Sequence, residues 1–536
     1  MSDDTRTANV ASPTSLPIFQ RNSSSHQARS LGGSMGDGAT GGRPVGEGSA
    51  RPDPAPQAST HSEAPSPERI ADLREALDRL AGVDWDVVAK LRLDVSTEIA
   101  ARFPNTPLNE DAHRDTVSVM VNNALDNYAD RRLTIGEDRL GTSERGELHR
   151  AVMVSMFGAG RLQPLLDLEG LENLEIEGHD QVILQFNDGR LEVGPAVADS
   201  DEQLIEEIRY IARTSSTGEN TFSQTRPWVR QTLPDGSRLA AEAWVTHRPS
   251  IAVRKHNYID TDLEQMRQLG AIDHSLQAFL STAIRAGKNI IVSGDPGSGK
   301  TTLSRALLNE LDVNERLATI EAQYELLMHQ MPHRHTRVWA AEQQPGGEAG
   351  ADGQPVGKVS LTRLIELSLQ KNVTRIVVGE VVGDEVMAMM EAMQGGRGSL
   401  STVHASSARD TIERLVTLIT RARSNADPNF GYRLVAQNID LIVHLNLTDE
   451  SPLEGGRRWR FVDDIVAVEV SRDTGVAFTP IYSPDAWGRA IPTGQYPPWL
   501  DQLRRHGFDA GLLEPDASTW GAPPELIIPP TNAGAA

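Results

Sequence analysis

The sequence predicts an α/β fold whose core is a parallel sheet, preceded by a small α+β domain and an N-terminal helical region. Two observations predict the core. Between about residues 272 and 445, short apolar runs alternate with helical stretches, and unbroken apolar runs are typical of strands that are covered on both faces. One of these runs, NIIVS, leads directly into the segment GDPGSGKTT and then into the helical stretch TTLSRALLNEL. That order is typical of a phosphate-binding loop between a strand and a helix.

Length and composition limit the classes of protein that fit. A chain of 536 residues is long enough for three or four domains. The net charge of −22 argues against a general nucleic-acid-binding surface, which needs clusters of lysine and arginine. The absence of cysteine excludes disulfides, thiolate metal sites and cysteine nucleophiles.

The sequence has no membrane or export signal of the usual kinds. No apolar run approaches the ~18 residues of a membrane span. The N-terminus MSDDTRTANV lacks the apolar centre of a signal peptide. We therefore expect a cytoplasmic protein that reaches a membrane only through partners.

Composition and periodicity divide the chain into a tail, a helical region, an α+β domain, a P-loop domain and an extension. The expected boundaries are 1–66, 67–165, 166–256, 257–475 and 476–536. The first segment is rich in Ser, Gly, Pro and Ala, so we expect a disordered tail. The last segment carries many prolines, and we expect a helix in WLDQLRRHGFDAGLL and a disordered end.

Hydrophobic periodicity identifies the middle segments. From Trp85 to Phe103 apolar residues recur every three or four positions, which predicts one helix face. Between 166 and 256 the period changes to two, and Asp-Gly pairs separate the strands, as in hairpins. The later stretch EQQPGGEAGADGQPVGK interrupts the α/β pattern and is predicted to be a mobile loop.

The segment after NIIVS matches the pattern G-x-x-x-x-G-K-[ST] at Gly294, Gly299, Lys300 and Thr301. Glycines allow backbone N–H groups to close around phosphate oxygens, and the following helix N-terminus adds partial positive charge. We expect Lys300 to bind the β- and γ-phosphates of ATP and Thr301 to bind Mg²⁺. The predicted nucleotide-binding residues are Gly294, Asp295, Pro296, Gly297, Ser298, Gly299, Lys300, Thr301 and Thr302. The alternative is a glycine-rich strand–helix turn.

Three later apolar runs end in chemically active side chains: Glu321, Glu380 and His404. The carboxyl ends of strands in such a sheet face the ligand, and ATP hydrolysis needs a carboxylate for water or metal. We expect Glu380 and Glu321 to be site carboxylates, Glu321 to face Mg²⁺, and His404 to sense the γ-phosphate. Glu325, one turn beyond Glu321, is a weaker candidate. The alternatives are capping carboxylates and a structural histidine.

Arg238 and Arg254 lie on predicted strands of the preceding domain. Arginines that reach across a cleft can stabilise charge on a transferring phosphate. The alternative is that both are ordinary surface arginines.

These motifs together resemble the type II/IV secretion-system ATPase family, most closely the CpaF-like branch that powers Tad (Flp) pilus assembly. The resemblance covers roughly residues 115–475. GDPGSGKTTL resembles the family's Walker A motif, TIEAQYEL its Asp box, RIVVGEVVGDE its Walker B motif and GSLSTVHASS its His box. LPDGSRL and SIAVRKH resemble its arginine-bearing strands.

The resemblance implies a homo-hexamer of subunits in which ATP lies between an N-terminal domain and a RecA-like P-loop domain. It makes Glu380 the catalytic glutamate, Glu321 the Asp-box acid and His404 the His-box residue. Arg238 and Arg254 correspond to family arginines that approach the γ-phosphate. It also implies an inner-membrane platform protein as partner and peripheral association with the cytoplasmic face of that membrane. The acidic net charge of the chain, rather than the resemblance, leads us to expect no direct contact with nucleic acid.

The sequence departs from the family pattern at several positions. Ala322 stands where the Asp box usually has aspartate, and Val382 where an arginine is common after the glutamate. The segment before Walker B has Gln370, Asn372 and Thr374 in place of two arginines and an acid. Cations near the phosphates stabilise the charge of the transition state. Because this sequence lacks some of the family's arginines, it does not predict the rate of ATP turnover.

Three functions are consistent with the sequence. The first is an ATPase motor for pilus assembly or secretion. The second is a motor for conjugative DNA transfer, and the third is a nucleotide-binding scaffold with weak turnover.

Overall fold

The computed structural model describes residues 82–103, 110–214, 222–344, 346, 356–423, 427–453, 455–473 and 475–528. The predicted tail at 1–66 and most of the predicted loop at 342–358 lie outside the described residues. Among the described residues, no helix combines the length and the apolar character that crossing a membrane requires.

The helical region consists of α2 (Trp85–Arg102), α3 (Glu110–Thr134) and α4 (Thr142–Phe157). Helix α2 begins after Asp84, whose carboxylate accepts hydrogen bonds from the first backbone N–H groups. Val88, Leu91 and Val95 on the predicted face of α2 are buried against α3 and α4. The spacing of apolar residues therefore located the packed face of this helix.

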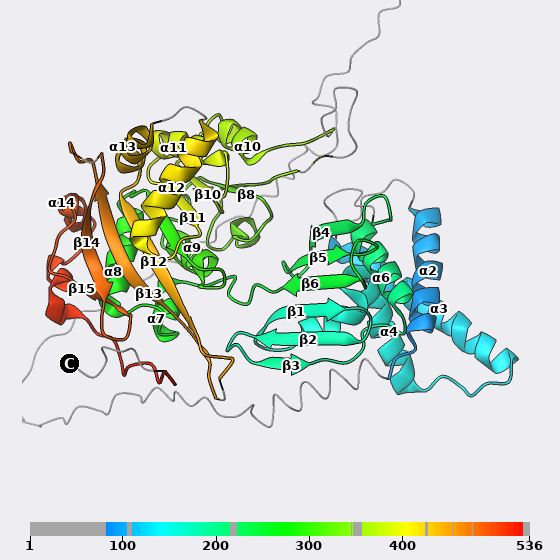
Figure 1. Cartoon of the computed structure of the whole chain (residues 1–536). Coiled ribbons are helices and arrows are strands. Elements are labelled where there is room, and N and C mark those ends of the chain that lie inside the picture. The colour runs from blue at the N-terminus through cyan, green and yellow to red at the C-terminus, as the bar shows by residue number, and fades with distance from the viewer. Residues whose placement is uncertain are drawn as a thin grey trace, which may run out of the picture. The chain divides into compact units, whose positions relative to one another are not determined.

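The α+β domain has one antiparallel sheet, here called the small sheet. Its strand order is β3-β2-β1-β6-β5-β4, and Figure 1 shows these strands with α6 (Asp201–Thr214). The strands are β1 (Leu171–Glu177), β2 (Gln181–Phe186), β3 (Leu191–Val193), β4 (Trp228–Thr232), β5 (Arg238–Glu242) and β6 (Ser250–Arg254). Short elements, a 3₁₀ turn (Gly160–Leu162) and α5 (Gln163–Leu166), lead into β1.

The second sheet, here called the core sheet, has the order β15-β14-β13-β12-β7-β11-β10-β8-β9 in the described part of the chain. The strands from β12 to β9 in this order are parallel, and β13, β14 and β15 extend the sheet antiparallel. They are β7 (Ile290–Gly294), β8 (Leu317–Glu321), β9 (Val338–Glu342), β10 (Arg375–Val378), β11 (Leu400–Val403), β12 (Leu441–Asp449), β13 (Arg458–Glu469), β14 (Ala477–Pro484) and β15 (Ala490–Pro492). A parallel sheet with helices on both faces confirms the predicted α/β fold.

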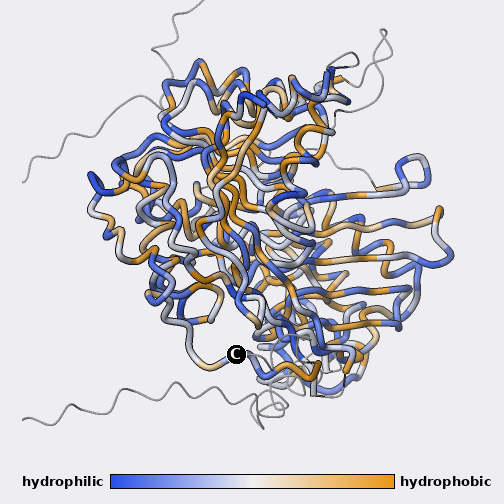
Figure 2. Tube along the Cα trace, turned by 60° about the vertical axis from the view of Figure 1, so that its left-hand side comes forward, coloured by the Kyte–Doolittle hydropathy of each residue, from blue (hydrophilic) through white to orange (hydrophobic). Residues whose placement is uncertain are grey.

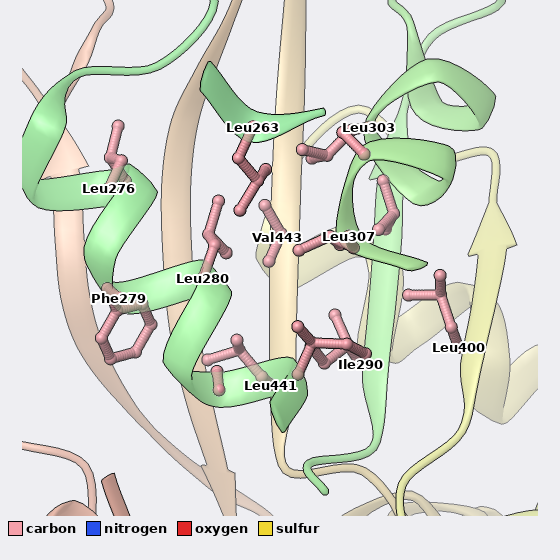
Figure 3. Close-up of a cluster of buried hydrophobic side chains, with 14 of the residues drawn as sticks. Leu263, Leu276, Phe279, Leu280, Ile290, Leu303, Leu307, Leu400, Leu441 and Val443 are labelled. Carbon is pink, nitrogen blue, oxygen red and sulfur yellow. The ribbon is translucent and has the colours of Figure 1, made fainter. Parts of the chain in front are cut away.

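Helices cover both faces of the core sheet. One face packs against α7 (Leu263–Gln268), α8 (His274–Arg285) and α9 (Lys300–Leu308). Figure 3 shows side chains of α8 and α9 meeting those of β7, β11 and β12 in this layer. The other face packs against α10 (Leu361–Ser368), α11 (Glu385–Gly395), α12 (Ala408–Ala422) and α13 (Pro428–Asn438).

The two sheets differ in hydrophobic pattern, as the sequence predicted. In β2 exposed or partly buried residues alternate with buried ones, whereas every residue of β7 and β8 is buried. Figure 2 shows the same contrast along the chain, with unbroken hydrophobic runs in the central strands. The period of the hydrophobic pattern therefore distinguishes a sheet with one solvent-exposed face from a sheet that packs against helices on both faces.

The expected boundary at residue 475 does not coincide with an edge of the core sheet, because β14 and β15 continue it. The C-terminal extension then adds α14 (Leu500–Arg505) and 3₁₀ turns (Ala510–Leu513 and Pro515–Ala517). Phe279 of α8 is fully buried against rings of this extension, including Trp499 and Phe508. The extension is therefore part of the packed domain through residue 528, and residues 529–536 lie outside the description.

Candidate functional site: a phosphate-binding loop and its neighbours

The predicted phosphate-binding loop connects β7 to α9 with the backbone geometry that glycine permits. Gly297 and Gly299 have φ of +78° and +97°, in the left-handed region. A Cβ on Gly294 would lie 2.4 Å from the carbonyl oxygen of Leu445. Helix α9 begins at Lys300, so its free N–H groups and partial positive charge face the loop. The loop has the form of a phosphate cradle.

Lys300 is held inside this loop. Its Nζ donates hydrogen bonds to the carbonyl oxygens of Gly294 (3.0 Å) and Asp295 (2.8 Å). The third neighbour is Nδ1 of His404 at 3.1 Å. Burial lowers the pKa of Lys300 to about 8. Phosphate oxygens in the place of the carbonyl partners would stabilise the charged form of Lys300 that burial disfavours.

His404, directly after β11, connects Lys300 to Glu380. An ammonium group can only donate, so Nδ1 of His404 accepts and Nε2 carries the ring proton. That Nε2 lies 2.7 Å from Oε1 of Glu380. The contact with His404 outweighs burial and lowers the pKa of Glu380, which stays ionised. The sequence therefore selected a lysine, a histidine and a carboxylate that the fold does bring together.

Glu380 lies two residues beyond the end of β10 rather than on the strand. Its side chain is 42% exposed. An ionised carboxylate that solvent can reach, fixed by a histidine, can orient a water molecule and accept its proton.

Glu321 ends β8 as predicted, and the hydrogen bonds of its carboxyl group go to the backbone of the turn that follows the strand. It is 2% exposed, and its Oε1 accepts hydrogen bonds from the backbone N–H groups of Glu325 (2.9 Å) and Leu326 (2.8 Å). Burial raises the pKa of Glu321 to about 8. This geometry makes Glu321 the support of the turn that follows β8.

The carboxylate that does meet Thr301 belongs to Glu325. Oγ1 of Thr301 donates to Oε2 of Glu325 at 3.0 Å. A hydroxyl and a carboxylate oxygen are suitable ligands for Mg²⁺. Among the described residues, no group of three His, Cys, Asp or Glu side chains forms a metal cluster. A hydroxyl, one carboxylate and substrate phosphates are nevertheless the usual Mg²⁺ environment in nucleotide sites.

Arg238 and Arg254 lie opposite each other on β5 and β6. Nε of Arg238 donates to Oε1 of Gln323 at 2.7 Å, and its Nη1 pairs with Glu325. Burial lowers the pKa of Arg238, and the charge of Arg254 contributes to the lowered pKa of Lys300. Both arginines therefore act on the electrostatics of the loop, and Arg238 reaches it through Glu325.

Two arginines that the sequence did not single out also contact the site. Arg305 is 2% exposed, and its guanidinium donates to the backbone carbonyl oxygens of Glu325 and Tyr258. On β13, Arg460 donates from Nε to the carbonyl of Gly297 (2.7 Å), and Nη2 pairs with Glu172 of β1 (3.0 Å). Both contacts join segments far apart in the sequence, so no local pattern marks them.

Comparison with known proteins matches this chain to one family. The family model for the type II/IV secretion system protein matches residues 196–473, which is more than half of the chain. That range includes the arginine-bearing strands, the loop and the core sheet through β13.

Among curated relatives, a type IV secretion system protein VirB11 of Bartonella quintana is 32% identical over 261 residues, 42% of this chain and 70% of that protein. A putative conjugal transfer protein of Mycobacterium tuberculosis is 27% identical over 315 residues, 57% of this chain and 85% of that protein.

Among solved structures, the VirB11 ATPase of Brucella suis, in complex with sulphate, is 24% identical. The match covers 59% of this chain and 96% of that one, with a TM-score of 0.30. The pilus retraction motor PilT with bound ADP is 14% identical, covering 65% and 86%, with a TM-score of 0.41.

Proposed function

This chain belongs to the type II/IV secretion system protein family and is an ATPase, and from this premise we propose that it is the motor of a pilus-assembly or secretion system. The observation that carries the proposal is the continuous contact from Lys300 through His404 to Glu380. It joins the group that binds phosphate to the group that activates water.

The residues of the site have separate roles in the proposed reaction. Lys300 and the N–H groups of the loop bind the phosphates of ATP, and Thr301 with Glu325 would hold Mg²⁺. Bound Mg²⁺ supplies positive charge to the phosphate oxygens. Glu380 orients the attacking water and accepts its proton, while the Nε2–H group of His404 keeps the Glu380 carboxylate in place and ionised.

Charge from the small sheet completes the site. As negative charge develops on the transferring phosphoryl group, the guanidinium groups of Arg238 and Arg254 stabilise it. Because Arg238 pairs with Glu325, exchange of this ion pair for contacts to nucleotide would couple the site to the α+β domain. Such an exchange is the kind of switch that moves one domain against another.

We propose that the chain works as a homo-hexamer attached to an inner-membrane platform protein at the cytoplasmic face of the membrane. The match to a secretion-system family supports this assembly. Transport of DNA is the second candidate, because one relative carries the description conjugal transfer protein. The net charge of −22 favours protein cargo over direct contact with DNA.

The test is ATP hydrolysis by the purified full chain, with and without added DNA. We expect hydrolysis that Lys300→Ala abolishes, that DNA leaves unchanged, and that the surface variant Glu366→Gln retains. Hydrolysis stimulated several-fold by DNA would favour the second candidate. No hydrolysis by the wild-type chain, even with the platform protein present, would contradict the motor.

A further inference from the structure

A second histidine lies close to the site but outside the contacts described above. His444 is on β12, which pairs with β7 on the side opposite β11. It is 5% exposed. Its Nδ1 lies 2.6 Å from Oδ1 of Asp463, and its Nε2 lies 3.3 Å from the carbonyl oxygen of Ala405. Ala405 directly follows His404, so this ring contacts the backbone of the segment that carries the site histidine.

The register of the core sheet explains why His444 reaches that segment. His444 of β12 and Val403 of β11 both pair with Ser293 of β7. The two strands therefore stand at the same level on either side of the strand that leads into the phosphate-binding loop. The chain after Val403 leads to α12, and the ring of His444 contacts this segment at the carbonyl oxygen of Ala405.

An irregularity in the sheet supplies the partner of His444. His444 pairs with Asp464 and the next residue, Leu445, pairs with Val462, so Asp463 is the extra residue of a β-bulge. A bulge redirects a side chain that would otherwise follow the alternation of the strand. Here the carboxylate of Asp463 meets the imidazole.

Both ring nitrogens of His444 face acceptors, a carboxylate and a carbonyl, so both must donate. Burial alone lowers the pKa of His444, and Asp463 together with the Ala405 carbonyl outweighs burial and raises it. Other charged groups near the ring are Asp464, whose pKa burial raises to about 6, and Asp410 at the start of α12. The ring is thus buried among groups that favour its protonated form.

We infer that His444 and Asp463 are positioning residues that hold the backbone at Ala405, and through it His404, in the orientation that ATP hydrolysis needs. The inference rests on the proposed function, because it assumes that His404 takes part in turnover. The hydrogen bonds of the His444 ring go to Asp463 and to the backbone of Ala405 rather than to the phosphate-binding loop. The pair acts as outer partners of ligating histidines do, fixing the orientation of the group that does the chemistry.

A double-mutant cycle on the full chain tests the inference. Its variants are His404→Ala, His444→Gln and the combination, with turnover measured against ATP concentration. We expect His444→Gln to lower kcat about 10-fold with KM for ATP within about twofold. Because His444 acts through His404, the double variant should be no slower than His404→Ala alone.

The matched control is His335→Gln. His335 is another buried histidine, with 3% of its surface exposed. Its Nε2 lies 2.9 Å from Oδ1 of Asn309, which is not a residue of the phosphate-binding loop. This variant should lower thermal stability without lowering kcat in either background. Asp463→Asn provides a second variant if His444→Gln does not fold, and it should give the same dependence on His404.

The outcomes separate this inference from the motor proposal. Losses that multiply in the double variant would overturn it, as would full activity of His444→Gln or of His404→Ala. Multiplying losses, or full activity of His444→Gln, leave the motor proposal standing, because that proposal depends on hydrolysis by the wild-type chain and its loss in Lys300→Ala. Full activity of His404→Ala would also remove the role that the proposed reaction gives to His404.

Discussion

The buried carboxyl group of Glu321 should make the stability of this chain fall as the pH rises, and Glu321→Gln should remove that dependence. The amide keeps an oxygen that can accept from the N–H groups of Glu325 and Leu326. It also has the shape of the protonated acid. The replacement therefore copies the neutral form of the side chain and eliminates its ionisation.

The magnitude follows from the shift in the pKa of Glu321 from 4.5 to about 8 on folding. The folded chain retains a proton that the unfolded chain releases between these two values, so stability falls through this window and is level above it. At 1.36 kcal/mol per unit the loss has an upper limit of roughly 5 kcal/mol. Relaxation and water entry reduce this to a few kcal/mol.

Thermal unfolding of nucleotide-free wild type and Glu321→Gln, measured at several pH values from 5 to 9, tests this reasoning. The melting temperature of the variant should exceed that of wild type by a margin that grows from pH 5 to pH 8 and then stays constant. At ~2–4 °C per kcal/mol for a domain of this size, the final margin should be about 5–10 °C. Glu366→Gln, an exposed matched change, should show no trend. A margin for Glu321→Gln that does not vary with pH would refute the assignment of a proton to Glu321.

Two further variants probe the metal site and the C-terminal extension. Glu325→Gln keeps an acceptor for Thr301 but loses the charge, so the Mg²⁺ concentration for half-maximal hydrolysis should rise about 10-fold or more; an unchanged Mg²⁺ dependence would mean that another carboxylate serves the metal. Phe279→Ala removes a ring buried against the extension and should lower the free energy of unfolding by about 3–5 kcal/mol. Denaturation measurements check this, and a loss below 1 kcal/mol would contradict the packing of the extension.

Local sequence patterns were sufficient for the fold and for the loop. The glycines of the loop, with Lys300 and Thr301, form a continuous segment whose geometry depends on the backbone conformations those residues allow. Glu380 and His404 could also be predicted, because the carboxyl ends of neighbouring parallel strands meet at one edge. These inferences need only strand order and direction.

The parts that the sequence missed depend on side-chain contacts between distant segments. Glu321 and Glu325 are both acidic and lie four residues apart, and only the packed turn shows which is buried and which reaches Thr301. In the sequence, Arg305 resembles an ordinary arginine on the surface of a helix. Only the structure shows that its side chain is buried. The proline content of the extension likewise led us to expect disorder at its end, and it gave no indication that aromatic residues there pack against Phe279.

The most direct test of the central claim compares ATP binding and ATP hydrolysis in Glu380→Gln. The structure places Glu380 beside His404, which lies between this carboxylate and Lys300 of the phosphate-binding loop. The account therefore predicts that this variant binds ATP with wild-type affinity while hydrolysing it at least ~100-fold more slowly, the loss typical of a missing general base. Hydrolysis at the wild-type rate by Glu380→Gln would contradict the account.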